Sequence, residues 1–258
     1  MPDATRTPAP GRQWLLGVLG VAMAGGCWEA AARLGLVDST YLPPPSAVFR
    51  ALPGLLIHGP LAGDLLASLI AITYGVVLAH LVSLPLAAAT FRFKWLREFI
   101  SPLVELVRGI APLALLPAFL LLFGIGRASA VAIIVWCAWV PIFLNLLEGL
   151  DAVDPTLVRS ARATGAGRLK VATSVLVPAS MGHYLTGLRL AIGSAWLAVV
   201  AAEMLGSNSG LGFRILEWSQ VFRITDMYAA IVVIGAAGLI MNSIVAATQR
   251  RLLRWRSA

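Results

Sequence analysis

Six apolar segments, each long enough to cross a lipid bilayer, constrain this chain more than any other feature. They cover residues 14–32, 64–90, 98–123, 128–149, 172–205 and 227–248. A helix needs roughly 20 apolar residues to span a ~30 Å hydrocarbon core. The segments are apolar nearly all round, which is typical of helices bundled in lipid. The sequence therefore predicts an all-α membrane protein, folded as one six-helix transmembrane bundle.

Composition supports the same class of protein. Hydrophobic residues make up 59% of the 258, charged residues 12%, and the mean hydropathy is +0.85. These values lie far outside the soluble range. The net charge of +8 is spread along the chain rather than gathered on a compact polar domain, so we expect no nucleic-acid partner.

The distribution of Lys and Arg predicts the orientation. With the N-terminus inside, 13 of the 20 basic residues fall on cytoplasmic segments and five on the opposite side. An excess of basic residues marks the cytoplasmic side, so both termini are expected there. The predicted organisation is a cytoplasmic tail at 1–13, a six-helix transmembrane domain at 14–248 with a cytoplasmic loop at 150–178, and a basic cytoplasmic tail at 249–258.

No catalytic or metal-binding pattern is present in the sequence. A phosphate-binding GxxxxGK[ST] loop, HExxH and GxSxG are all missing, and His58, His80 and His183 are scattered. Cys27 and Cys137 fall within predicted spans without metal-ligand neighbours. We therefore expect no enzyme activity, cofactor or metal in this chain. Any energy source is then an ion gradient or a partner that hydrolyses nucleotide.

The longest polar interruption runs from residue 159 to residue 178. Small residues alternate there with Arg159, Arg162, Arg168 and Lys170. This pattern favours a short helix, a turn at Gly165 or Gly167, and a second short helix. Small side chains allow a partner surface to approach closely. The segment is therefore a candidate protein-docking site, and the alternative is a solvated connecting loop.

The spacing within this segment resembles a known signature. Gly165 is followed by nine residues and then by the run 175–178, Val-Leu-Val-Pro, as in the EAA signature of bacterial ABC-importer permeases. Segments 42–46, 122–126, 202–206 and 209–212 strengthen the resemblance to the nitrate, sulfonate, taurine and bicarbonate branch. One departure is that Arg159-Ser160-Ala161 stands where the family has Glu-Ala-Ala, which reverses a charge.

The resemblance implies a type I importer permease in the bacterial cytoplasmic (inner) membrane. Its expected partners are two ATPase subunits that bind ATP and Mg, a second and identical permease subunit, and a periplasmic or lipid-anchored substrate-binding protein. The expected solute is a small anion such as nitrate, a sulfonate or taurine, or bicarbonate. A vitamin precursor or an aromatic acid is the alternative solute. A gradient-driven secondary transporter or channel, and a purely structural membrane subunit, are the alternative functions.

Two sets of candidate residues follow. The family's ATPase-coupling role is carried over to Asp154, Leu157, Arg159, Ala161, Arg162, Ala163, Gly165, Ala166 and Pro178. The candidates for the substrate path are Arg108 and Arg189, each about ten residues into a predicted span and hence roughly 15 Å deep. Glu105 precedes Arg108 by one helical turn, so an ion pair between them is the alternative to contact with a passing anion.

Overall fold

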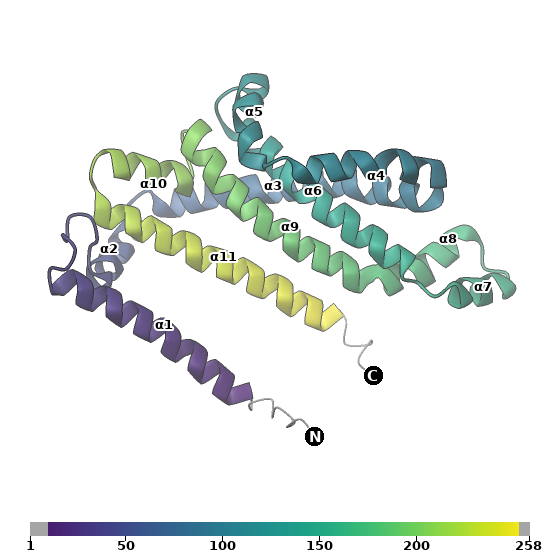
Figure 1. Cartoon of the computed structure of the whole chain (residues 1–258), viewed down its shortest axis with the longest axis horizontal. Helices are drawn as coiled ribbons and strands as arrows, with labels where there is room; N and C mark the ends of the chain where they lie inside the picture. Colours follow the sequence, from purple (N-terminus) through teal and green to yellow (C-terminus); the bar gives the residue numbers. More distant parts are fainter. Residues whose placement is uncertain (1–9, 253–258) are drawn as a thin grey trace.

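The computed structural model describes residues 10–252, and its regular elements are all helical across that range (Figure 1). Parts of the tails predicted at 1–13 and 249–258 lie outside the described residues. The elements in chain order are α1 (Pro10–Arg33), α2 (Pro45–Ile57), α3 (Leu61–Arg92), α4 (Lys94–Gly109), the 3-10 helix η1 (Pro112–Leu115), α5 (Leu116–Phe123), α6 (Arg127–Asp151), α7 (Pro155–Ala163), α8 (Arg168–Val171), the π-helical turn η2 (Ala172–Leu176), α9 (Val177–Gly206), α10 (Leu211–Gln220) and α11 (Ile224–Leu252).

Four helical segments are long and apolar enough to cross a membrane. They are α3, α6, α11 and the continuous segment Arg168–Gly206, which joins α8 to α9. The spans predicted at 64–90, 128–149, 172–205 and 227–248 are thereby confirmed as long apolar helices. The segment predicted at 14–32 lies within α1, and its membrane crossing stays a prediction. The chain is a multi-pass membrane protein.

The segment predicted as a span at 98–123 is not one continuous helix. Helix α4 ends at Gly109, and α4 meets the η1–α5 segment at an angle of 90°. Ile110 and Ala111 are extended, with ψ of 121° each, and at Ala111 the following Pro112 disfavours the helical region. Figure 1 shows α5 projecting from the bundle as a result. The two pieces together form a broken span or a re-entrant segment.

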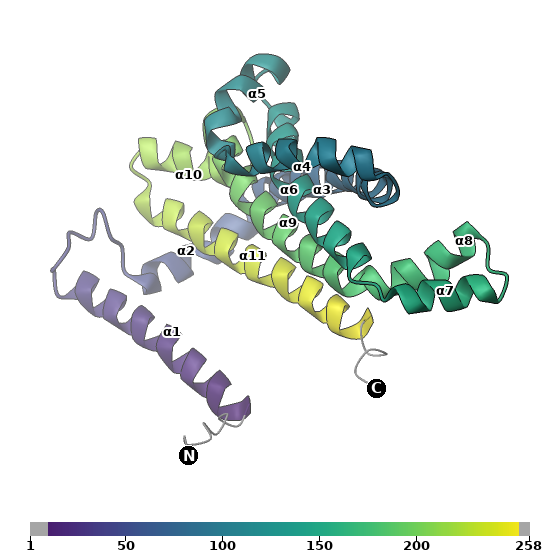
Figure 2. The ribbon, with the colours of Figure 1, turned by 45° about the vertical axis from the view of Figure 1, so that its right-hand side comes forward.

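Helix α6 lies at the centre, between α3 and α9. Ala138 of α6 and Ala191 and Ala195 of α9 are fully buried. Small side chains let membrane helices approach closely, so packing rather than hydrophobic exclusion holds this core together. Helix α11 lies along α9, and α1 lies at the edge of the bundle, where it contacts α2 (Figure 2).

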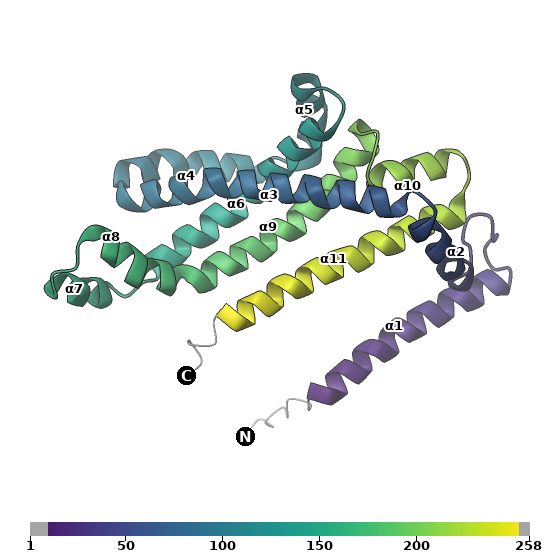
Figure 3. The same ribbon diagram turned by 180° about the vertical axis from the view of Figure 1, so that it is seen from behind.

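The bundle has two distinct ends. Helices α7 and α8 extend from one end, toward which the first turn of α1 and the last turn of α11 also point (Figures 1 and 3). Helices α2 and α10 lie at the opposite end. Both helices are short and lie outside the six predicted spans.

Candidate functional site

Helix α7 begins at a capped N-terminus. The Thr156 N–H donates to Asp154 Oδ1 at 2.7 Å, and Pro155 occupies the first helical position, where no N–H is needed. This backbone hydrogen bond is the main cause of the lowered pKa of the Asp154 carboxyl. A carboxylate at this position also complements the helix dipole. The predicted coupling residue Asp154 therefore has a structural role in starting the helix.

The helix ends in a Schellman turn centred on Gly165. The Gly165 N–H donates to Arg162 O at 3.0 Å, and the Ala166 N–H donates to Ala161 O at 3.1 Å. Gly165 has φ of +82°, a conformation that other residues adopt at a cost. Gly167, the other residue considered for this turn, is extended with φ of −66°. The glycine-dependent turn therefore lies at Gly165.

Helix α8 continues into α9 without a break. The π-helical turn at Ala172–Leu176 precedes Pro178, which has no N–H to offer to the preceding turn. Pro178 therefore follows a local change of helical pitch and does not break the helix. The result is one helical segment of 39 residues, Arg168–Gly206, that runs from the loop through the bundle.

The outer surface of this loop is both apolar and basic. The side chains of Leu157 on α7 and Leu169 on α8 are 53% and 79% exposed. The side chains of Arg159, Arg162, Arg168 and Lys170 form no ion pair with any carboxylate in residues 17–252. Exposed apolar side chains beside unpaired cations are typical of a docking surface.

The predicted coupling residues do not all lie on one face. Arg162 and Ala166 line a cavity of about 1180 Å³ between the loop and the ends of α3 and α6. Leu157, Arg159 and Ala163 are exposed and are not among its lining residues. Helix α7 therefore presents one face to the bundle and another to the surroundings.

The candidates for the substrate path lie in two separate places. Arg108 Nη1 pairs with Glu105 Oε1 at 3.0 Å, as the spacing predicted, and 54% of the Arg108 side chain stays exposed. Arg108 lines a cavity of about 400 Å³ together with Asn145 and Glu148 of α6. It lies in the last turn of α4, beside the 90° bend, rather than midway along a straight span.

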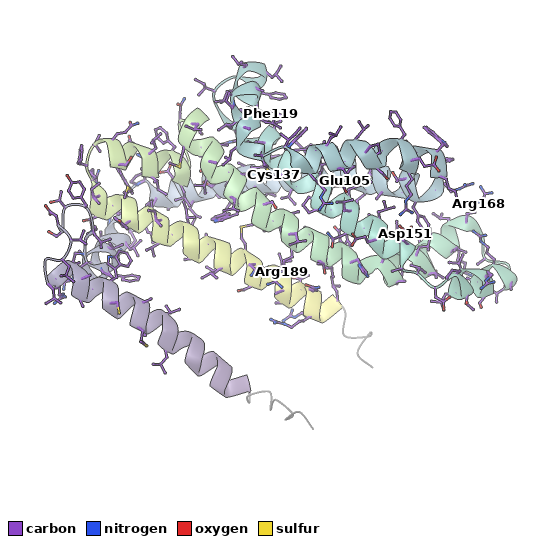
Figure 4. The ribbon with its side chains drawn as sticks, viewed as in Figure 1. Glu105, Phe119, Cys137, Asp151, Arg168 and Arg189 are labelled. Atoms are coloured by element: carbon purple, nitrogen blue, oxygen red, sulfur yellow. The ribbon has the colours of Figure 1, made fainter. Side chains whose placement is uncertain are left out.

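Arg189 is on α9 and faces a different helix. Its Nε donates to Asn242 Oδ1 of α11 at 2.8 Å, and the side chain lines a separate cavity of about 210 Å³. Figure 4 shows Arg189 on the α11 side of α9, apart from Glu105. The structure therefore does not bring Arg108 and Arg189 together.

Sequence reasoning missed a polar cluster at the α10 end, which we call the outer cluster: Asp64, Ser68, Glu203, Gly210, Leu211, Gly212, Arg214. Ser68 Oγ donates to Glu203 Oε2 at 2.9 Å. Asp64, Ser68 and Glu203 are at most 5% exposed. A carboxylate inside an apolar run is costly unless partnered, so Glu203 within the fifth span was the available signal.

The outer cluster closes the N-terminus of α10 onto α3 and α9. The N–H groups of Gly210, Leu211 and Gly212 donate to Asp64 Oδ1, Ser68 Oγ and Glu203 Oε2 at 3.1, 3.0 and 3.0 Å. Arg214 Nε donates to Asp64 Oδ2 at 2.7 Å. Gly210 has φ of +107°, and a Cβ there would lie 2.2 Å from Glu203 Cδ. Only glycine fits this approach of backbone to carboxylate.

The described structure is a multi-pass helical bundle with an exposed helical loop, α7–α8, that is continuous with the spanning helix α9. No cluster that could hold a metal ion occurs among the described residues. Residues 75–257 match the family described as "Binding-protein-dependent transport system inner membrane component". The chain belongs to this family and is an ABC transporter permease of the importer type.

Two curated relatives and one solved structure illustrate the family. The chain is 32% identical over 251 residues to the taurine transport system permease protein TauC of Escherichia coli, covering 95% of this chain and 90% of TauC. It is 31% identical over 252 residues to the bicarbonate transport system permease protein CmpB of Synechococcus elongatus, covering 93% and 88%. A chain of the inward-facing MetNI methionine ABC transporter shares the fold with a TM-score of 0.64 at 17% identity, covering 75% of this chain and 94% of that one.

Proposed function

We propose that this permease forms the translocation path of an ATP-driven importer in the bacterial cytoplasmic membrane. Helix α1 and the broken α4–α5 segment complete six crossings, with both termini and the α7–α8 loop in the cytoplasm. The observation that carries the proposal is the helical loop α7–α8, which exposes Leu157 and Leu169 and continues into α9. A separate ATPase subunit docks on this surface.

The continuity of α8 with α9 suits mechanical coupling. Two ATPase subunits bind ATP and Mg and close on one another, and a second, identical permease subunit completes the path. Closure displaces α7–α8, and because Arg168–Gly206 is one helical segment, α9 moves with it against α6. ATP and a solute-loaded binding protein at the α2 and α10 end must each favour a different state of the bundle. This chain hydrolyses nothing itself.

The solute that fits best is a small anion. Taurine and bicarbonate, named in the descriptions of TauC and CmpB, both carry an oxyanion. Arg108 supplies a half-exposed guanidinium to the cavity of about 400 Å³. Its partner Glu105 and Glu148 of the same lining compete for this charge, so an anion gains its help in a low-dielectric region only by displacing them. Arg189 instead holds α9 to α11 through Asn242. A sulfonate or bicarbonate is therefore favoured over a vitamin precursor or an aromatic acid.

Co-purification with the cognate ATPase subunit tests the coupling surface. The double variant Leu157→Asp/Leu169→Asp places two charges on the surface that is proposed to be covered. It should insert normally, because neither side chain is buried, and should lose the ATPase. Leu36→Asp is the matched control, since Leu36 is 74% exposed in the connection between α1 and α2 at the opposite end. Retention of the ATPase by the double variant would refute the docking role.

A further inference from the structure

The cavity between the α7–α8 loop and the bundle is a space that the proposed transport cycle does not use. Its volume is about 1180 Å³. Its lining is mostly apolar, with Leu84 and Phe91 from α3, Leu146 from α6, Leu176 from η2 and Met181 from α9. It therefore reaches from the membrane-spanning part of the bundle to the level of α7–α8.

The lining of the same cavity includes three cations. Arg92 ends α3, Arg162 is on α7 and Arg168 begins α8, and all three side chains are exposed. No aspartate or glutamate is among the lining residues, and none of the three guanidiniums has an ion-pair partner in residues 17–252. The Arg92 guanidinium lies 5.4 Å from the centroid of the Phe93 ring, an aromatic contact that leaves its charge uncompensated. Three cations therefore line one cavity without a counter-ion among the described residues.

We propose that this cavity binds an anionic phospholipid of the cytoplasmic leaflet. The apolar lining accommodates an acyl chain, and the guanidiniums bind the phosphate of the headgroup through charge-assisted hydrogen bonds. A water-soluble anion would leave the apolar lining uncovered, and a zwitterionic lipid would leave the cations only partly neutralised. The assignment to the cytoplasmic leaflet rests on the topology proposed above. The lipid site itself rests on the cavity and its charges.

A second apolar cavity provides an internal comparison. It has a volume of about 790 Å³ and is lined by Tyr74 and Leu78 of α3, Phe119 of α5 and Trp136 of α6. Its single charged lining residue is Arg127. Acyl chains fit against both cavities, but only the cavity at the coupling loop concentrates cations. Selectivity for an anionic headgroup should therefore depend on Arg92, Arg162 and Arg168 and not on Arg127.

A lipid bound at this site would connect the α7–α8 loop to the bundle. The headgroup would bridge Arg92 on α3 to Arg162 and Arg168 on the loop. The side-chain hydrogen bonds of Arg159 and Thr173 stay within the loop and the start of the helix that follows it, so they do not reach α3. The lipid would thus hold α7–α8 against the end of α3. An anionic lipid would in this sense be a structural component of the α7–α8 loop.

Native mass spectrometry of the full-length permease in detergent tests the proposal. The protein is titrated with phosphatidylglycerol and with phosphatidylcholine of identical acyl chains. The wild type should bind phosphatidylglycerol more tightly, and Arg92→Gln/Arg168→Gln should reduce that preference by on the order of tenfold. The control Arg127→Gln should keep the wild-type preference. Monodisperse elution of each variant confirms that it is folded.

A second variant separates the cavity from its charges. Ala88 is an exposed lining residue on α3, and Ala88→Trp fills the space while all three arginines remain. It should weaken phosphatidylglycerol binding without changing the charge of the protein. Unchanged phosphatidylglycerol binding in Ala88→Trp, a preference retained in Arg92→Gln/Arg168→Gln, or a preference lost in Arg127→Gln would overturn the site. Displacement of the lipid by inorganic phosphate alone would show a free-anion site and would also overturn it. Because the readout needs neither ATPase nor uptake, failure here leaves the transport proposal untouched.

Discussion

The outer cluster and the α7–α8 loop carry charged residues at opposite ends of the same bundle, yet they use them in opposite ways. In the outer cluster Asp64 and Glu203 are buried and accept hydrogen bonds from Ser68, Arg214 and the first turn of α10. In the loop, the cations are exposed and have no carboxylate partner among the described residues.

The difference shows how to separate structural charge from functional charge in a membrane protein. Charges whose partners lie within the chain hold helices together, and removing one leaves its partner stranded. Charges without internal partners stabilise little by themselves and are available to an external one. Substitutions at the α10 end should therefore reduce folding, whereas substitutions at the loop should reduce association.

Glu203→Ala should have the largest effect. It removes the acceptor of the buried Gly212 N–H and leaves that donor unsatisfied, whereas the Ser68 hydroxyl can still donate to Asp64 O at 3.1 Å. The expected loss of stability is roughly 1–3 kcal/mol. The measurement is the yield and thermal stability of the detergent-purified permease.

Glu98→Ala is the matched control for that variant. Glu98 is an exposed carboxylate on α4, so its removal strands no buried donor and should leave yield and melting temperature unchanged. Equal stability of Glu203→Ala and Glu98→Ala would mean that the hydrogen bonds of the outer cluster do not stabilise the fold.

The same glycine substitution at both ends sharpens the comparison. Gly210→Ala introduces strain at φ of +107° and places a Cβ 2.2 Å from Glu203 Cδ, so folded yield should fall strongly. At Gly165, φ is +82°, but no atom would lie within 4 Å of an added Cβ. Only backbone strain of about 1 kcal/mol is therefore expected. Gly165→Ala should therefore fold and should lower ATP-driven uptake per assembled complex.

Gly167→Ala controls for the presence of a methyl group in the loop. Gly167 has φ of −66° and open space where a Cβ would lie, so alanine fits without strain. Uptake should match the wild type. A result in which Gly165→Ala and Gly167→Ala behave alike would show that the left-handed turn does not matter for coupling.

Much of the fold could be predicted from hydropathy because spans depend on local composition. Helices α3, α6, α9 and α11 follow from it directly, and the turn at Gly165 follows from its glycine. The bend after α4 could not be read from hydropathy, because Pro112 in an apolar run is compatible with either a kink or a complete break. Charge spacing identified the Glu105–Arg108 pair, since it is local to one helix turn.

The outer cluster could not be predicted because it is long-range. Asp64 and Arg214 are 150 residues apart in the sequence, and nothing local indicates that they meet. The same limit applied to Arg189, whose partner Asn242 is on another helix. The division of α7 into two faces also needed the structure, because only the cavity that α7 lines together with α3 and α9 shows that Arg162 lies on the bundle side.

Asp154→Ala should loosen α7 without affecting the bundle. The carboxylate accepts the Thr156 N–H, and its loss frays the first turn of an exposed helix. Hydrogen exchange of α7 amides should accelerate while that of α6 stays constant. The pKa of Asp154 is lowered in the folded protein, so the cap is fully present above the ordinary aspartate pKa and is lost as pH falls through the folded value. Titration of this cap should therefore leave the protection of α7 unchanged between neutral and mildly acidic pH.

Arg159→Ala should have the smallest effect. It tests most directly whether the unpaired cations of the α7–α8 loop interact with a partner. Arg159 is exposed, and its side chain makes a 3.5 Å approach to Thr156 Oγ1 on its own helix, so melting temperature should not change. If the side chain faces an acidic group of the ATPase, its removal should weaken ATPase association by less than about fivefold, because exposed ion pairs contribute little. The contribution should also vanish at high ionic strength, where exposed charges are screened.

Association is therefore measured at low and high salt for the wild type, Arg159→Ala and Arg159→Lys, the last of which keeps the charge. A salt-independent defect in Arg159→Ala would indicate a packing role instead, and a lower melting temperature would place Arg159 with the structural charges of the outer cluster rather than with the loop.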